Sequence, residues 1–226
     1  MATIGEGMGW FKKNFGAAAT AALNGTPYDL DFLTAIAVQE TFEVWGGLFK
    51  TMPPAQVLEV CVGDTLDAPN RSAFPTTKAD LLRAPNGPAI FQVARQALEQ
   101  MATYVHSYQP AARNPDKFCH GFGIFQFDIQ FCTKFPDFFL NKQYRDIGAC
   151  LTRAIQELDE AKTRAYGTGK TRLTDSEMVY VAIAYNQGHV NTHGSFQQGF
   201  FDHGSGKFYG ELIADYLALA RTVPSA

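Results

Sequence analysis

A glutamate near the end of an apolar helical stripe is the residue best placed for acid–base chemistry. Glu40 comes four residues after Ile36 and three after Ala37, so in a helix these side chains share one face. A carboxyl group at the edge of an apolar face is partly removed from water, which favours its neutral form. Such a group can hold a proton near neutral pH and deliver it to a leaving oxygen, which is general acid catalysis.

A second segment, Gly121-Phe122-Gly123-Ile124-Phe125-Gln126-Phe127, has the composition of a ligand-binding turn. Its glycines permit a tight turn and close approach of a ligand to the backbone. Gln126 offers both a donor and an acceptor, as an acetamido group requires, and Phe127 beside it is a candidate substrate contact. A dinucleotide-binding loop is excluded, because the third glycine is missing and no strand is predicted before the segment. A purely structural turn is the alternative interpretation.

A third segment, Ala184-Tyr185-Asn186-Gln187-Gly188, ends a helix that is apolar on nearly every side. A tyrosine at this place can bring its hydroxyl into an apolar cleft beside a carboxyl group. Asn186 adds a group that both donates and accepts hydrogen bonds, which suits the hydroxyls of a sugar. The structural alternative is a buried tyrosine followed by an ordinary helix ending.

Helical periodicity dominates the elements that must position these residues. Asp29 caps a predicted helix at 30–44, and a capping box at Thr174 begins the buried helix that Gly188 ends. Further helices are predicted at 1–25, near 55–62, at 91–108 with a stop at Pro110, from 147 to a stop at Gly167, and at 208–221. Glycine and proline interrupt 45–86, and 109–142 is expected to be rich in loops. No sustained strand alternation occurs, so the predicted fold class is mainly α.

The composition indicates a globular protein and excludes two kinds of partner. The chain has 226 residues, of which 46% are hydrophobic and 18% charged, enough for one domain with a substantial core. A net charge of −3 without a run of lysine or arginine argues against nucleic acid, and no apolar run approaches the roughly 20 residues that span a membrane. The cysteines allow three complete disulfide pairings or four buried free thiols: Cys61, Cys119, Cys132 and Cys150.

In their order along the chain, Glu-Thr, Gly-Ile-Phe-Gln and Ala-Tyr-Asn-Gln-Gly resemble motifs of the lytic transglycosylases and goose-type lysozymes. The resemblance covers the helix before Glu40 and the chain from about His120 onward. It implies a single lysozyme-like domain over residues 1–226, with an inserted lobe at about 46–117 between the glutamate and the glutamine loop. In that family the intervening stretch is usually short, so this lobe departs from the pattern.

The resemblance also implies roles for individual residues. Glu40 matches the catalytic acid, Gln126 the substrate-binding glutamine of the loop, and Tyr185 a tyrosine that hydrogen-bonds near the acid. Asn186 matches the asparagine beside that tyrosine. Thr41, also expected to contact the substrate, stands where the family usually has serine, a change that keeps the hydroxyl.

The implied reaction is cleavage of peptidoglycan glycan strands between N-acetylmuramic acid and N-acetylglucosamine, with Glu40 as the only acid and base. The expected product is a 1,6-anhydro sugar. A hydrolytic muramidase or a chitinase on the same scaffold would instead need a second carboxylate to hold water. The candidates for this second group are Glu43, Asp64, Asp67 and Asp128.

No cofactor or metal is expected for this chemistry. The spacing of His189 and His193 suggests a zinc site, but Val190 stands where a metalloprotease motif has glutamate. The alternative of another class is a glycan-binding or structural protein without catalysis.

The expected place of action is the bacterial periplasm or cell wall. Residues 1–25 have the outline of a signal peptide but are too weakly apolar for one, which favours delivery by a phage or a secretion system. A toxin delivered into rival bacteria would be matched by an inhibitor or immunity protein that fills the cleft.

Overall fold

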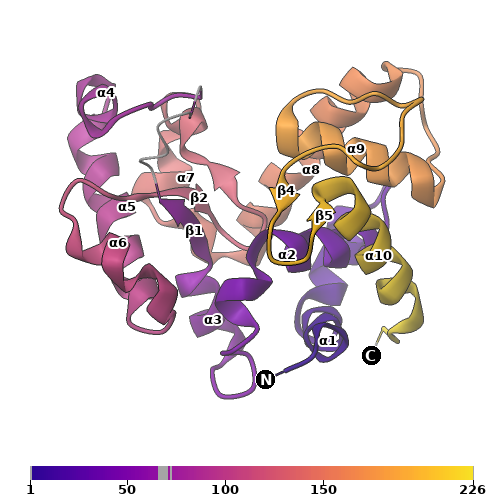
Figure 1. Cartoon of the computed structure of the whole chain (residues 1–226), viewed down its shortest axis with the longest axis horizontal. Coiled ribbons are helices and arrows are strands. Elements are labelled where there is room, and N and C mark those ends of the chain that lie inside the picture. The colour runs from indigo at the N-terminus through magenta and orange to yellow at the C-terminus, as the bar shows by residue number, and fades with distance from the viewer. Residues whose placement is uncertain (1, 66–70, 72, 226) are drawn as a thin grey trace. The chain divides into compact units, whose positions relative to one another are not determined.

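The chain is mainly helical, as predicted, with a small strand content that the sequence did not indicate (Figure 1). The computed structural model describes residues 2–65, 71 and 73–225. The α-helices are α1 (Ile4–Ala22), α2 (Leu30–Trp45), α3 (Pro54–Val60), α4 (Lys78–Arg83), α5 (Gly87–Ala102), α6 (Gln109–Arg113), α7 (Pro136–Leu140), α8 (Ile147–Tyr166), α9 (Asp175–Gln187) and α10 (Tyr209–Thr222). The strands are β1 (Val62–Thr65), β2 (Cys119–Phe122), β3 (Phe127–Asp128), β4 (Phe201–Asp202) and β5 (Lys207–Phe208), and the short 3₁₀ helices are η1 (His106–Tyr108), η2 (Ile129–Thr133) and η3 (Gln143–Arg145).

The described chain divides into two compact units. The terminal unit consists of Ala2–Phe42 and Leu151–Ala226, and the central unit consists of Glu43–Cys150. The boundaries fall within α2 and within α8. The segment 46–117, for which the sequence suggested an inserted lobe, belongs to the central unit.

Helix caps define the terminal unit much as the sequence predicted. The Asp29 carboxylate accepts the Phe32 N–H at 2.9 Å and caps α2, and Thr174 forms the predicted capping box at the start of α9. Gly167 ends α8 and Gly188 ends α9, both with positive φ. Helix α9 is apolar on most sides because it is the buried helix of this unit, with core residues that include Val179, Val181, Ala182 and Ile183.

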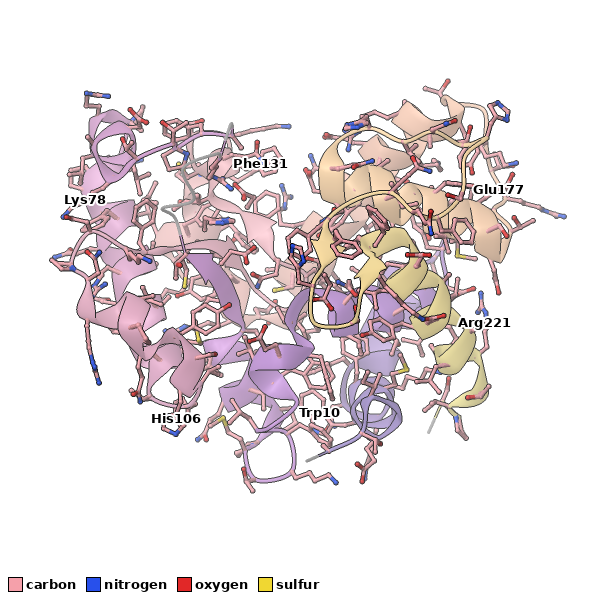
Figure 2. All side chains as sticks on the ribbon, viewed as in Figure 1. Trp10, Lys78, His106, Phe131, Glu177 and Arg221 are labelled. Carbon is pink, nitrogen blue, oxygen red and sulfur yellow. The ribbon has the colours of Figure 1, made fainter. Side chains whose placement is uncertain are left out.

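A buried lysine ties α1 to the end of α10. The Lys12 ammonium donates to the carbonyls of Ala220 and Val223 at 2.7 and 2.6 Å and pairs with Asp31 at 2.5 Å. These bonds add a charged donor to carbonyls at the C-terminal end of the helix, where few backbone donors are available. Arg221, labelled in Figure 2, adds ion pairs to three carboxylates of the same unit: Asp29, Asp31 and Asp175.

The central unit contains an antiparallel sheet in the order β1-β2-β3. Val62 pairs with Phe122 and Gly63 with Gly121, so two distant segments meet across β1 and β2. A strand therefore does precede the glutamine loop, contrary to the expectation from the sequence. The missing third glycine is what still argues against a dinucleotide site.

Helix α5 also departs from the prediction of a helix at 91–108. It begins at Gly87 and ends at Ala102, and Pro110 does not stop it but lies in the first turn of α6. Proline is tolerated there because the first N–H groups of a helix have no partner within the helix. The short α3 confirms the helix predicted near 55–62, whereas α4 was not predicted.

Phenylalanine side chains pack around β3. The Phe127 ring, 4% exposed, stacks on Phe131 at 4.9 Å between centroids and contacts Phe138 edge-on at 5.0 Å. The four cysteines are buried, unbonded thiols. Burial raises the pKa of the Cys150 thiol to about 12, so this group is unreactive at neutral pH.

Candidate active site

Glu40 lies on α2, in the terminal unit, at the end of a buried helical segment. Phe32, Leu33, Ile36 and Ala37 are fully buried, whereas Glu40 itself is half-buried. The side chain is therefore placed at the margin of the apolar core, as the spacing of the apolar residues predicts.

Tyr209, the first residue of α10, donates its hydroxyl to Glu40 Oε1 at 2.7 Å. The tyrosine is 2% exposed. Burial, followed by the charge of Glu40 and the hydrogen bond to it, raises the pKa of the Tyr209 hydroxyl well above its usual range. Tyr209 therefore stays protonated and remains a hydrogen-bond donor to Glu40 at any physiological pH.

This hydrogen bond distinguishes the two oxygens of Glu40. The hydroxyl of Tyr209 has one hydrogen, which it directs to Oε1, so Oε1 acts as an acceptor. In the neutral form of the carboxyl group, the proton then resides on Oε2. After Oε2 has released this proton, the same hydrogen bond stabilises the carboxylate. The arrangement suits a group that gives up a proton and later takes one back.

Tyr185 lies on α9 close to this pair. It is half-buried, and its electrostatic interaction with Tyr209 contributes to the raised pKa of the Tyr209 hydroxyl. The terminal unit thus brings together Glu40, Tyr185 and Tyr209. The first two were candidates from the sequence, whereas Tyr209 was missed, because nothing in the sequence around it distinguishes it from other tyrosines at helix starts.

The two amide side chains after Tyr185 hold the segment before β4. Asn186 Oδ1 accepts the Phe200 N–H at 3.2 Å, and Gln187 Oε1 accepts the Gly199 N–H at 3.2 Å. Asn186 is exposed, and its amide nitrogen makes no hydrogen bond to the described residues. One end of this side chain therefore positions the backbone, and the other can donate to a ligand.

Thr41 follows Glu40 but points into the helix. Its side chain is buried, and its hydroxyl donates to the Ala37 carbonyl at 3.1 Å. This bond to the preceding turn fixes the Thr41 rotamer beside Glu40.

In the central unit, Gln126 has a backbone conformation that non-glycine residues seldom adopt. Its φ is 53°, and its Nε2 donates to the Gly123 carbonyl at 2.9 Å. A Cβ atom on Gly121 would come within 2.1 Å of Gln126 Oε1, and one on Gly63 within 2.6 Å. The paired glycines of β1 and β2 thus make room for this half-buried side chain. Its neighbour Phe127 belongs to the aromatic core, where its ring has little surface to offer a ligand.

The candidate second carboxylates have different surroundings. Glu43 and Asp64 are exposed. The pKa of the Tyr108 hydroxyl is raised mainly by its burial and next by the negative charges of Asp64 and Glu43, so these three side chains lie close together. Asp67 lies outside the described residues.

Asp128 is held by two cationic or polar partners. It accepts a hydrogen bond from Arg71 at 2.6 Å and lies 3.1 Å from His120 Nδ1. Burial by itself would raise the pKa of Asp128, but the bonds and charges of His120 and Arg71 together lower it. A carboxylate held in its charged form in this way is a weak base.

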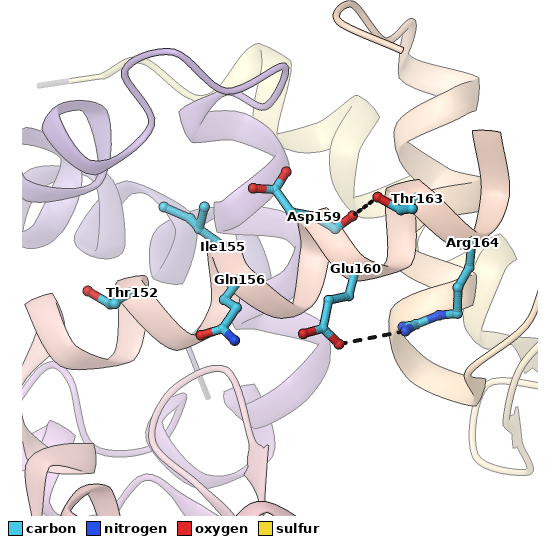
Figure 3. A pocket seen from close by; sticks show the side chains of 7 residues that line it. All are labelled: Thr152, Ile155, Gln156, Asp159, Glu160, Thr163 and Arg164. Atoms are coloured by element: carbon cyan, nitrogen blue, oxygen red, sulfur yellow. Dashed lines mark hydrogen bonds and ion pairs between the residues drawn. The ribbon is translucent and has the colours of Figure 1, made fainter. Parts of the chain in front are cut away.

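A separate cavity of about 610 Å³ lies along α8 in the terminal unit (Figure 3). None of the residues predicted to act on a substrate lines it. Its wall contains polar side chains paired with one another or with their own helix, including Glu160 with Arg164 at 3.9 Å. The lining residues are Thr152, Ile155, Gln156, Asp159, Glu160, Thr163 and Arg164.

Comparisons of the chain with family models, with curated proteins and with solved structures find no match. Among the residues that the structure describes, there is also no helix with both the length and the apolar character needed to cross a bilayer.

Proposed function

We propose that this protein cleaves the glycan strands of bacterial peptidoglycan between N-acetylmuramic acid and N-acetylglucosamine, with Glu40 as the catalytic acid and base. The observation that supports it is the hydrogen bond from the buried Tyr209 hydroxyl to Glu40 at the margin of an apolar core. A second support is the resemblance of three short segments to lytic transglycosylases and goose-type lysozymes. The lysozyme-like fold belongs to the same proposal.

The reaction begins with transfer of the Glu40 proton from Oε2 to the glycosidic oxygen. As the bond from this oxygen to the anomeric carbon breaks, the acetamido group of the sugar stabilises the positive charge on the carbon. The Tyr209 hydroxyl stabilises the carboxylate left on Glu40. Glu40 then removes the proton of the sugar's own 6-hydroxyl, whose oxygen attacks the anomeric carbon. The product is a 1,6-anhydro sugar, and Glu40 has regained its proton.

A hydrolytic muramidase or a chitinase is the alternative within enzymes. Hydrolysis would need a carboxylate that activates water. Asp128 is poorly suited, because both of its carboxylate oxygens already contact Arg71 or His120. Glu43 and Asp64 keep this alternative open, since both are exposed. The alternative of another class is a protein that binds glycan and performs no catalysis.

The test is mass spectrometry of purified peptidoglycan after digestion with the wild-type chain and with Glu40→Gln. We expect anhydro-muropeptides from the wild type, and a loss of about 100-fold or more in rate for Glu40→Gln, because the amide has no proton to donate. Glu99→Gln is the matched control, since Glu99 is a helical, exposed glutamate of the central unit. It should leave the rate unchanged.

The other outcomes of this digestion separate the alternatives. Reducing ends in place of anhydro ends indicate a hydrolase, and products from chitin oligomers alone indicate a chitinase. If neither substrate yields products, or if Glu40→Gln retains full activity, the proposal is wrong.

The proposed place of action is the bacterial periplasm or cell wall. Expression with a periplasmic leader should lyse bacteria when Glu40 is present and spare them with Glu40→Gln. A small protein that restores growth and co-purifies with the chain would be the inhibitor or immunity partner expected of a delivered toxin.

A further inference from the structure

Among the described residues with large apolar side chains, Phe200 is the most exposed, at 65% of its surface. It lies in the terminal unit, in the loop that connects α9 to β4 (Figure 1). Single exposed apolar side chains are common on proteins, so exposure alone does not indicate a role. What sets Phe200 apart is how firmly its backbone is held.

Both backbone polar groups of Phe200 are hydrogen-bonded. Its N–H donates to Asn186 Oδ1 at 3.2 Å, and its carbonyl accepts the Tyr209 N–H at 2.7 Å. The preceding peptide is fixed as well, because the Gly199 N–H donates to Gln187. The motif residues after Tyr185 thus hold an exposed aromatic residue in place.

The backbone before β4 is also bonded to the first turn of α10. Beyond the pair Phe201–Phe208, the Tyr209 N–H bonds to the Phe200 carbonyl and the Gly210 N–H to the Gln198 carbonyl. Gly199 has a φ of 88°, in the left-handed region that favours glycine. These bonds fix the direction in which the chain passes Tyr209.

Phe200 is connected directly to the residue that contacts the proposed acid. Tyr209 donates its backbone N–H to Phe200 and its hydroxyl to Glu40. One residue thus links the exposed ring to the candidate catalytic carboxyl group, entirely within the terminal unit.

We infer that Phe200 is a stacking platform for one pyranose ring of the glycan strand, with the free amide nitrogen of Asn186 as a hydrogen-bond donor to the same sugar. This inference rests on the proposed function, because it takes the substrate to be a strand of N-acetylated sugars. The face of an aromatic ring carries partial negative charge, which attracts the C–H groups on the face of a sugar ring.

The chemistry around Phe200 favours a sugar over an apolar protein partner. The nearby exposed side chains are polar, including Asn186, Asn191 and Gln197, and such groups pair with hydroxyl and acetamido groups. An apolar protein partner would require a contiguous apolar patch. A ring on a fixed backbone also loses little conformational entropy on binding.

Binding is tested separately from catalysis, in the Glu40→Gln background. The dissociation constants of N-acetylglucosamine tetramers and of purified muroglycan tetramers are measured by calorimetry for this chain and for the double variant with Phe200→Ala. We expect roughly tenfold weaker binding after loss of the ring, and near-parental binding with Phe200→Trp, which keeps a stacking surface. Leu219→Ala, which removes another exposed apolar side chain of the same unit, should bind as the parent does.

Kinetics in the active chain give a second readout. Phe200→Ala should raise KM about tenfold while kcat changes less than twofold, because the platform holds the sugar equally in the ground and transition states. The melting temperature should stay that of the wild type, since the lost ring is mostly exposed.

The inference fails if Phe200→Ala binds glycan as tightly as the parent, or if Phe200→Ala and Leu219→Ala weaken binding equally. It also fails if the Glu40→Gln parent binds neither oligomer. The proposed function fails independently: a parent that binds glycan through Phe200, while the wild type releases no products, supports the platform and overturns the enzyme.

Discussion

The Glu40 carboxyl group and the Tyr209 hydroxyl form a pair in which each oxygen has a defined role. Oε1 accepts a hydrogen bond from a tyrosine that stays protonated, and in the proposed reaction Oε2 carries the proton that is exchanged. Tyr209 is a positioning residue in the proposed reaction, because it acts on the substrate only through Glu40. Tyr185 lies close to the same hydroxyl.

Replacing Tyr209 with phenylalanine tests this role. Without the donated hydrogen bond the charged form of Glu40 is less stable, so kcat should fall about 10- to 100-fold. For the same reason Glu40 should keep its proton to higher pH, and the alkaline limb of the pH–activity profile should move upward. Both effects are measured as kcat against pH on purified peptidoglycan.

Tyr28→Phe is the matched control, because Tyr28 is also buried in the terminal unit and donates its hydroxyl to a carboxylate, Asp159, at 3.2 Å. It should leave the pH profile in place. Equal effects of Tyr28→Phe and Tyr209→Phe on kcat would mean that Tyr209 has only a structural role.

The elements that build this pair are the end of α9, the β4–β5 hairpin and the start of α10. Gly188 ends α9 in the left-handed conformation, and the amides of Asn186 and Gln187 then hold the strand entry at Gly199 and Phe200. The hairpin leads directly into α10, whose first residue is Tyr209. The backbone bond from Tyr209 to Phe200 and the left-handed conformation of Gly199 therefore help to decide where the Tyr209 hydroxyl lies.

Gly199→Ala should disturb that geometry. Its φ of 88° is unfavourable for alanine, and the new Cβ would come within 2.8 Å of Tyr209 Cβ, so Tyr209 must move. We expect a loss of about 1–2 kcal/mol in stability from the backbone strain, together with a fall in kcat similar to that of Tyr209→Phe. Thermal unfolding and the digestion rate measure the two effects.

Gly206→Ala, in the turn of the same hairpin, is the control that distinguishes backbone strain from steric contact with Tyr209. Gly206 has a φ of 72°, but a Cβ there meets no heavy atom within 4 Å. This variant should lose a comparable amount of stability and keep its kcat. If Gly206→Ala loses activity as Gly199→Ala does, contact with Tyr209 is not the cause.

Taken as a whole, the described chain has two compact units, and each unit contains one of the two tryptophans. Trp10 lies in the terminal unit and Trp45, fully buried, in the central unit. The proposed acid and its tyrosine partners lie in the terminal unit. Gln126 and the described candidates for a second carboxylate, Glu43, Asp64 and Asp128, lie in the central unit.

The stability of the central unit should depend on acid pH through Asp128. Its pKa is lowered in the folded state, so its contribution is complete above the unfolded value of about 3.9 and is lost as pH falls through the folded value. Asp128→Asn should cost about 2 kcal/mol at pH 7. The difference from the parent should shrink at pH 3, where the parental carboxylate takes up a proton.

The measurement is urea unfolding in a Trp10→Phe background, so that fluorescence reports Trp45 alone. Asp116→Asn is the control, because Asp116 belongs to the same unit but its ion pair with Lys78 is largely exposed. If the difference in the free energy of unfolding between Asp128→Asn and its parent is the same at pH 7 and pH 3, the charge of Asp128 does not have this role.

The sequence alone determined most of the helices of the terminal unit, because caps, glycine stops and apolar spacing act over a few neighbouring residues. It also identified Glu40 as a carboxyl group at the margin of the core. The predicted bounds of α5 were wrong, and so was the prediction that Pro110 stops this helix. A proline can either follow the end of one helix or lie in the first turn of the next, and the sequence does not distinguish the two.

Only the tertiary structure decided which distant groups meet. Tyr209 is 169 residues from Glu40, the partner of Asn186 is a backbone N–H 14 residues further on, and β1 pairs with β2 across more than fifty residues of chain. Such contacts leave no periodic pattern in the sequence. They depend on packing and on hydrogen bonds that form when the chain has folded, and these bonds give the proposed acid its donor and Phe200 its fixed position.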